Sequence, residues 1–304
     1  MRMRTVQYDL TQGNITRNLM KFALPLMVGN LLQQLYNVAD TLIVGQFLGP
    51  DALAAVGSSY TLMVFLTSIL LGLCMGSSAF FSMQYGRRDF DRLKQGICLA
   101  FGLIGVITLA LNVAVFVYLD WILEVLQVPP EVYDLMREYL VYIFLGIAAT
   151  FLYNYFANLL RAVGNSVVPL IFLAACALLN IALDLIFVLV FSWGVKGAAI
   201  ATVISQYVSG IGIMIYYLAR FPELRVERRH MRWNGAILKE IASLSCLTCV
   251  QQSIMNLGIL MVQGLINSFG KVVMAAFAAA VKIDSFAYMP VQDFGNAFST
   301  FIAQ

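Results

Sequence analysis

Residues 29–57, GNLLQQLYNVADTLIVGQFLGPDALAAVG, form a long apolar run that is interrupted once, at Gly49-Pro50. Glycine next to proline is typical of a turn. The run therefore predicts the outer two-thirds of one membrane-spanning helix, a tight turn and the start of the next helix. A spanning helix needs about 20 mostly apolar residues, so the fold of the chain depends on how often such runs recur.

One face of the first predicted helix is polar, because Gln33, Tyr36, Asn37 and Asp40 recur at spacings of three and four. A carboxylate inside a lipid-spanning helix is strongly unfavourable unless it faces a cavity or a partner. The polar face is therefore predicted to turn away from lipid. The alternative is a packing stripe that forms hydrogen bonds to neighbouring helices.

The composition is that of an all-α, polytopic membrane protein. Only 12% of the 304 residues are charged, whereas soluble domains have about 25%. The net charge of +3 indicates no nucleic-acid surface, and membrane lipid is the expected surrounding. All five cysteines fall in apolar runs, so no disulfide framework is expected, and Cys246 and Cys249 are interpreted as buried thiols rather than a redox pair.

Apolar runs of spanning length occur eight times. They cover residues 17–47, 52–84, 93–119, 132–160, 166–193, 196–219, 237–268 and 272–304. Between the third and fourth runs, residues 120–128, DWILEVLQV, are too short to span and are expected at the membrane interface.

Basic residues separate to one side of these runs. On that side lie 15 of the 19, namely Arg2, Arg4, Arg17, Lys21, Arg87, Arg88, Arg92, Lys94, Arg161, Arg220, Arg225, Arg228, Arg229, Arg232 and Lys239. Arg137, Lys196, Lys271 and Lys282 lie towards the other side. Cytoplasmic loops carry an excess of Lys and Arg, so we expect a multi-pass protein of the plasma or bacterial inner membrane with a cytoplasmic N-terminus.

The longest polar stretch, residues 220–235, holds the only histidine, His230. We interpret it as a basic, solvated cytoplasmic linker, with a regulatory or lipid-headgroup site as the alternative. It divides the chain into residues 1–219, with six predicted spans, and residues 236–304, with two.

Weak internal matches relate the two parts. Phe81 and Gln84 match Phe301 and Gln304 at a constant offset, and other matches keep their order over two spans. Six spans are an even number, so both repeats enter the membrane in the same direction, and their axis is expected along the membrane normal. We therefore expect two lobes of six spans each, the second truncated here after two spans, in a longer natural protein.

Polar groups of four predicted helices converge at one depth in the outer half of the membrane. From the helix rise, Asp40 and Asp184 lie about 13 Å deep, Tyr139 about 12 Å and Thr202 about 10 Å. Asn180 lies one turn from Asp184 on the same face. Two carboxylates with amide and hydroxyl oxygens suit Na⁺ or a shared proton. An inert network between helices is the alternative.

The eighth predicted span has three ionisable side chains. Lys282 and Asp284 are near its outer end and are expected to reach the surface or to pair there. Asp293 lies deeper, and its partners are expected in the remaining spans of the longer protein.

Four stretches together resemble the multidrug and toxic compound extrusion (MATE) transporters, and the likeness runs through the whole chain. They are LPLMVGNLLQQLYNVADTLIVGQFLGPDALAAVG (24–57), RAVGNSVVPL (161–170), LLNIALDLIFV (178–188) and GVKGAAIATVISQ (194–206). The resemblance implies twelve spans in two six-helix lobes around a central cavity, with a complete N-lobe here and the first two spans of the C-lobe. It also implies exchange of Na⁺ or H⁺ for organic cations and other amphiphilic compounds.

The resemblance also implies residue roles. The N-lobe cation site would use Asp40, Asn180, Asp184 and Thr202, with the Ala198 carbonyl as a further ligand. The polar cavity lining would be Gln33, Tyr36, Asn37, Tyr139 and Asn154. Some members carry a glutamate in the seventh span, but this chain has only Gln251, Gln252 and Asn256 there, so a C-lobe site of that kind is not expected.

We therefore expect a cation-coupled antiporter for amphiphilic or cationic small molecules, with H⁺ or Na⁺ as its coupling ion and no other cofactor. The alternative, a lipid-linked saccharide flippase of similar architecture, predicts cationic side chains in the cavity, whereas the predicted N-lobe spans offer acids and amides. An enzyme is not expected, because no span carries a histidine cluster, a Ser/Lys pair or an HExxH motif. The sequence does not identify the substrate or choose between H⁺ and Na⁺.

Overall fold

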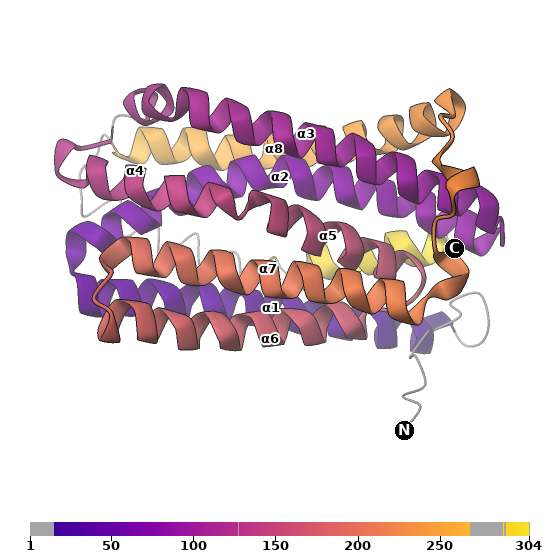
Figure 1. The fold of residues 1–304 in the computed structure, drawn as a ribbon, viewed down its shortest axis with the longest axis horizontal. Helices are drawn as coiled ribbons and strands as arrows, with labels where there is room; N and C mark the ends of the chain where they lie inside the picture. The colour runs from indigo at the N-terminus through magenta and orange to yellow at the C-terminus, as the bar shows by residue number, and fades with distance from the viewer. Residues whose placement is uncertain (1–14, 127, 268–287, 289, 304) are drawn as a thin grey trace.

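The computed structural model describes residues 15–126, 128–267, 288 and 290–303, and Figure 1 shows them as a bundle of long helices. The predicted all-α fold is confirmed for these residues, which include no strand. In chain order the elements are α1 (Ile15–Leu48), α2 (Pro50–Gly86), α3 (Phe90–Val125), α4 (Pro130–Leu145), α5 (Ile147–Ala162), α6 (Val167–Asp184), the π-helical η1 (Leu185–Val190), α7 (Gly194–Arg220), the short 3₁₀ turns η2 (Pro222–Leu224) and η3 (Arg228–Met231), and α8 (Gly235–Asn267). Residues 290–303 are also helical.

The turn predicted at Gly49-Pro50 separates α1 from α2. Gly49 has a φ of +91°, which glycine adopts without the steric strain of other residues. Pro50 begins α2, where its missing N–H has no helical partner to lose. The two helices therefore meet at a sharp corner, as residues 29–57 predict.

The fourth predicted span, residues 132–160, is not one straight helix, and that prediction is wrong in detail. It consists of α4 and α5, which are bent by 46° where they meet at Gly146. A Cβ at Gly146 would lie 2.9 Å from Val203 Cγ2 and 3.1 Å from Ile143 O, so α7 approaches the break closely. This tertiary contact, which has no local signal in the sequence, accompanies the bend.

Residues 120–125 continue α3, which ends at Val125, and residue 127 lies outside the described residues. The end of α3 is tied to α4, since Arg137 Nε donates to Asp120 Oδ1 at 2.6 Å. The expected position of residues 120–128 at the membrane interface stays a prediction.

The helices α2 and α8 pack together closely although they are far apart in sequence (Figure 1). Gly72 and Gly76 of α2 lie against the backbone of Cys249 and Ser245 of α8, and a Cβ at either glycine would collide with it. Ser77 and Ser245 also share a hydrogen bond of 3.0 Å between their hydroxyls. Small residues that let two backbones approach are the usual basis of helix packing in membranes.

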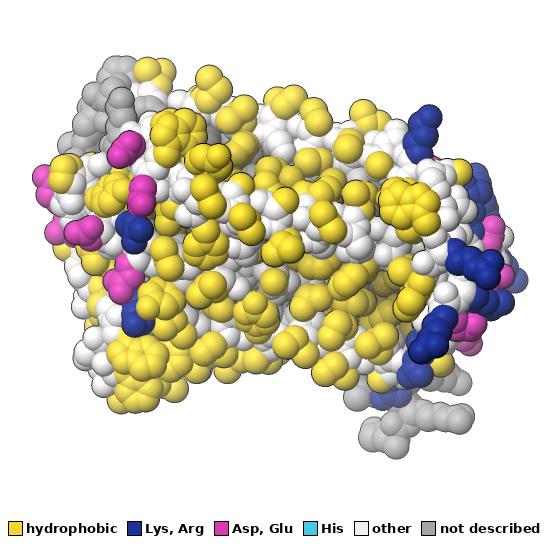
Figure 2. Space-filling model, turned by 45° about the horizontal axis from the view of Figure 1, so that its top comes forward, with side chains coloured by type: hydrophobic (Ala, Val, Ile, Leu, Met, Phe, Trp, Pro, Cys, Tyr) yellow, Lys and Arg dark blue, Asp and Glu magenta, His cyan; other side chains and the backbone are white. Residues whose placement is uncertain are grey.

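The outer surface has the character of a membrane protein. Figure 2 shows apolar side chains along the length of the bundle, while Lys and Arg gather at one end. Among the described residues, four helices are long and apolar enough to cross a membrane, or five if the bent pair α4–α5 is counted as one span. The helices α1 and α8, over the first and seventh predicted spans, are not among them.

Part of the eighth predicted span, with Lys282 and Asp284, lies outside the described residues, as do Arg2, Arg4 and Lys271. The count of eight spans and the division into lobes at residue 219 stay predictions.

The predicted linker is folded onto the bundle rather than fully solvated. Leu224 and His230 are buried, and Tyr217 Oη donates to the Leu224 carbonyl at 2.7 Å. His230 Nε2 lies 3.0 Å from Asp91 Oδ1, and Gln95 Nε2 donates to the Arg232 carbonyl at 2.9 Å. The linker is therefore fixed to the first turns of α3.

Candidate functional site

Two buried carboxylates from different helices form the centre of the site. Asp40 lies on α1 and is 9% exposed, and Asp184 is the last residue of α6 and has no exposed surface. Because α1 packs along α6, the two carboxyl groups lie close enough to act on each other. The structure thus brings together the two acids that the helix rise predicts at one depth.

The helix that carries Asp184 changes its geometry directly after it. Residues Leu185–Val190 form a π-helical turn, in which the Phe191 N–H donates to the Ile186 carbonyl at 3.0 Å. Turns of this type are rare and occur frequently at functional sites. The π-helical turn was not predictable from the sequence, since nothing in the composition of these apolar residues distinguishes it from an ordinary helix.

An amide and a hydroxyl connect the acids to α7. Asn180 Nδ2 donates to Thr202 Oγ1 at 3.2 Å, and Thr202 Oγ1 donates in turn to the Ala198 carbonyl at 3.1 Å. The Asn180 amide N–H and the Thr202 hydroxyl are therefore both directed towards acceptors on α7. The amide oxygen of Asn180 is left as an acceptor beside Asp184, which is one turn away on α6.

The site has buried oxygen atoms without donors. Within the described part of the chain, Asp40 Oδ1, Asn180 Oδ1 and both carboxylate oxygens of Asp184 are buried and have no hydrogen-bond partner. Buried polar atoms are nearly always paired in folded proteins, and bare carboxylate oxygens are particularly unfavourable. This donor-free group of oxygens fits a positive charge, either a proton or a hard cation such as Na⁺.

Two tyrosines complete the surroundings of the acids. Tyr36 on α1 and Tyr139 on α4 both lie within electrostatic range of Asp40 and Asp184. Tyr139 is buried, and Tyr36 is half-buried. Four helices, α1, α4, α6 and α7, therefore contribute to one site.

The other residues predicted for the cavity are not brought to the acids. Gln33 is exposed, and Asn37 is half-buried on α1. Asn154 Nδ2 donates at 2.8 Å to the Thr150 carbonyl of its own helix. None of the hydrogen bonds among the described residues joins these three side chains to Asp40 or Asp184, so their role in a cavity stays a prediction.

The second predicted part of the chain has no comparable site in α8. Gln251 is exposed, and Asn256 Nδ2 donates at 2.9 Å to the Gln252 carbonyl of the same helix. The one acid of α8, Glu240, pairs with Arg92 at 2.5 Å near the basic end. Asp293, whose partners were expected in the remaining spans of the longer protein, bonds to Asn30 of α1.

The sequence matches a family model described as MatE over residues 25–186, slightly more than half of the chain. The chain is 30% identical over 297 residues to the "Probable multidrug resistance protein YpnP" of Bacillus subtilis, covering 98% of this chain and 66% of that protein. It is 26% identical over 285 residues to the "Multidrug export protein MepA" of Staphylococcus aureus, covering 92% of this chain and 62% of the relative. The chain thus spans a little less than two-thirds of these relatives.

The fold is similar to that of solved transporters. An "outward-facing conformation of a multidrug resistance MATE family transporter of the MOP superfamily" has a TM-score of 0.88 and 23% identity, and the match covers 99% of this chain and 67% of that one. A transporter of the same superfamily from Pyrococcus furiosus has a TM-score of 0.89 and 24% identity, with 99% and 67% coverage. Its structure is described as having a binding pocket of reverse polarity that suggests a different function.

Proposed function

The chain belongs to the MatE family, and from this premise we propose that it acts as a cation-coupled antiporter that exports amphiphilic or cationic small molecules. The names of the relatives, multidrug resistance and multidrug export proteins, support the class of substrate. The premise also makes the protein a carrier rather than an enzyme.

The donor-free oxygens of Asp40, Asn180 and Asp184 carry the proposal. Two carboxylates held together in a low dielectric repel each other when both are ionised. A bound H⁺ or Na⁺ removes this repulsion and so favours the arrangement in which α1 and α6 are close together. An ion that binds one conformation better than another shifts the equilibrium between them, and this is how the ion would drive transport.

Which oxygens bind the coupling ion depends on whether that ion is H⁺ or Na⁺. A proton needs only the Asp40–Asp184 pair, since one protonated carboxyl can donate to the other. Sodium would need more oxygens, and Asn180 Oδ1 is the additional acceptor without a donor. The Ala198 carbonyl, proposed as a further ligand, already accepts from Thr202.

The surroundings of the acids favour export of cations over transport of a phosphate-linked sugar. Among the residues that the structure describes, the groups found to act on Asp40 and Asp184 include no basic side chain. Tyr36 and Tyr139 instead offer aromatic faces near two acids, which is a suitable environment for an organic cation. Because pocket polarity differs among solved relatives, the flippase remains an outcome that the test must be able to reveal.

The test is transport by the native protein reconstituted in vesicles. A pH gradient and a Na⁺ gradient are imposed in turn, and efflux of a fluorescent organic cation is measured. Asp40→Asn and Asp184→Asn are expected to abolish gradient-driven efflux, while Asp51→Asn, an exposed acid in the first turn of α2, retains it. Gradient-independent movement of a lipid-linked saccharide, with no efflux of the cation, would support the flippase and contradict the proposal.

A further inference from the structure

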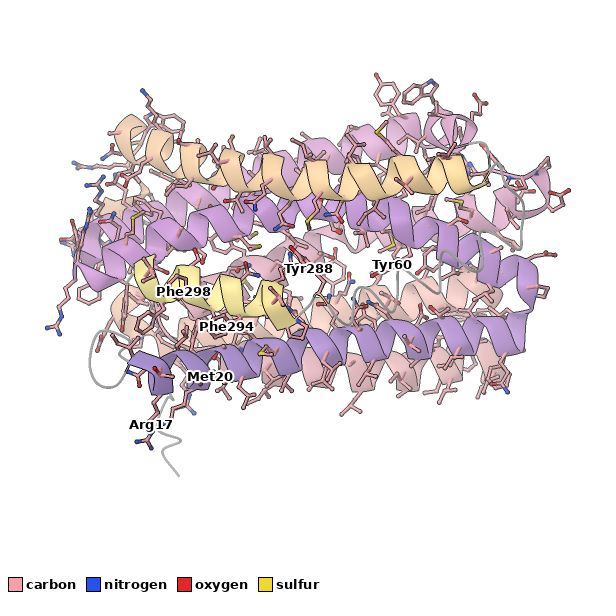
Figure 3. All side chains as sticks on the ribbon, turned by 180° about the vertical axis from the view of Figure 1, so that it is seen from behind. Arg17, Met20, Tyr60, Tyr288, Phe294 and Phe298 are labelled. Carbon is pink, nitrogen blue, oxygen red and sulfur yellow. The ribbon has the colours of Figure 1, made fainter. Side chains whose placement is uncertain are left out.

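A third buried acid lies outside the proposed cation site, where the helical segment 290–303 packs against α1. Ala297 of this segment is buried in a small apolar cluster with Leu19, Phe22 and Leu26 of α1. Figure 3 shows Phe294 and Phe298 on this segment beside α1, which carries Met20. We call this contact between α1 and residues 290–303 the α1 seam. Asp293 lies in it with only 3% of its surface exposed.

One oxygen of Asp293 is paired across the α1 seam and the other is not. Asn30 Nδ2 of α1 donates to Asp293 Oδ1. Asp293 Oδ2 is buried and has no hydrogen-bond partner within the described part of the chain. The Asn30 amide can donate to Asp293 in either protonation state, because both a carboxylate oxygen and the carbonyl oxygen of a carboxylic acid accept a hydrogen bond.

Among the described residues, the charged side chain that acts on Asp293 is Arg161 at the end of α5. The segment 290–303 has no other charged residue, and α1 has none between Lys21 and Asp40. Asp40 is ten residues from Asn30, about 15 Å along α1 by the helix rise. The Asp293 carboxyl is therefore separate from the Asp40–Asp184 pair.

We propose that Asp293 is a second proton-binding site, which takes up its proton when the α1 seam is closed. Burial disfavours the ionised carboxylate relative to the neutral acid, because burying a charge is more unfavourable than burying a hydroxyl. Opening of the α1 seam would hydrate Asp293 and release the proton. Protonation would then stabilise the closed contact between α1 and residues 290–303.

The ligand is a proton rather than a metal cation. A metal ion would need several oxygen ligands, whereas the described neighbours that act on the Asp293 carboxyl are the Asn30 amide N–H, which donates to Oδ1, and the charged side chain of Arg161. The positive charge of Arg161 opposes the binding of any cation, a proton included. A proton nevertheless removes the buried charge by binding to a single oxygen, whereas a metal ion needs several ligands. The inference does not depend on what the protein transports.

Infrared difference spectroscopy tests this proposal on the native protein in lipid, because protonated carboxyl groups have their own C=O band. Between high and low pH, Asp293→Asn is expected to lose one carboxylic acid component that the unmodified protein shows. Asp40→Asn should lose a different component. Asp293→Glu should shift the band rather than remove it, which separates loss of the site from loss of the fold. Gln292→Ala, a substitution at the neighbouring half-buried residue, should leave the spectrum unaltered.

Two results would overturn the proposal. If the spectra of Asp293→Asn and of the unmodified protein coincide, Asp293 does not exchange a proton over the pH range studied. If Na⁺ at constant pH removes the component lost in Asp293→Asn, the ligand is a metal cation.

Closure of the α1 seam is measured separately with spin labels. Met20→Cys and Phe298→Cys place labels at exposed positions on its two sides, in a background without the native cysteines. The fraction of molecules with a short distance between the two labels is expected to grow as the pH falls. In Asp293→Asn this fraction should not change with pH. An equal pH response with and without Asp293 would contradict the link between the proton and closure.

Discussion

At the scale of single residues, the proposed cation site is a set of acceptors that lack donors. The donors of Asn180 and Thr202 are directed away from the acids, towards Thr202 and the Ala198 carbonyl. Asp40 and Asp184 therefore face each other with nothing from these neighbours to balance their charge. A site built in this way depends on both acids together, and this has consequences for mutation.

The two acids are expected to act as one unit. Asp40→Asn and Asp184→Asn should each remove ion coupling, and the double variant should be no worse than either single variant, because residues in one network are strongly non-additive. The measurement is ion-driven efflux by the singles and the double in matched vesicles. Additive partial losses would mean that each carboxylate binds on its own.

Thr202 is expected to tune the site without being essential to it. Thr202→Val keeps the shape but removes the hydroxyl, so that the Asn180 amide loses the acceptor that fixes its orientation. Loss of one buried hydrogen bond is expected to weaken ion binding about tenfold, or about 1.4 kcal/mol. Thr202→Ser should restore the affinity, which is measured from the ion dependence of efflux. An unchanged affinity in Thr202→Val would remove this residue from the site.

The sequence was sufficient for the central residues of the site but not for the α1 seam. Asp40 and Asp184 were predictable because both lie in long apolar helical runs, whose rise places them at one depth even though a π-helical turn follows Asp184. Asn30 and Asp293 are 263 residues apart, and no helical periodicity relates them. Only the packing of residues 290–303 against α1 brings them together.

At the scale of helices, the close packing of α2 and α8 holds together distant parts of the chain. Gly76 faces the Ser245 backbone, and Gly57 of the same helix has nothing within 4 Å of the position of a Cβ. Gly76 and Gly57 therefore offer a matched test of the contact between α2 and α8. The same substitution, glycine to alanine, is made in the same helix, but only Gly76 faces α8.

Gly76→Ala is expected to destabilise the protein by about 1–3 kcal/mol, because the added methyl group must separate the two backbones. Gly57→Ala should instead stabilise it by about 0.5–1 kcal/mol, since alanine favours the helix. Thermal unfolding of both variants in the same detergent provides the measurement. Equal effects would show that α2 and α8 do not pack as closely as the structure has them.

Helix positions were predictable from apolar runs and turn residues, but their irregularities were not. Gly49 and Pro50 favour a turn through their own backbone preferences, so the turn between α1 and α2 was predictable from the sequence. The bend at Gly146 involves Val203 of α7, and the linker is folded because His230 meets Asp91. Both features depend on neighbours from other elements, which a local pattern cannot contain.

At the scale of the whole molecule, charge is distributed unequally between the two ends of the bundle. Figure 2 shows Lys and Arg concentrated at one end, where α2 ends, α7 ends and the linker lies. The opposite end carries Glu131 at the start of α4 and Lys196 at the start of α7. In a membrane such an imbalance sets the orientation, with the basic end on the cytoplasmic side.

The orientation can be tested with two single cysteines in a background without the native five. Arg228→Cys in the linker and Glu131→Cys at the start of α4 are both at exposed positions, at opposite ends of the bundle. An impermeant thiol reagent added outside intact cells should label Glu131→Cys only, and Arg228→Cys should react only after the membrane is opened. Labelling of both from outside would contradict a bundle that crosses the membrane along its long axis. Labelling of Arg228→Cys alone would reverse the orientation and place the Asp40–Asp184 site in the inner half of the membrane.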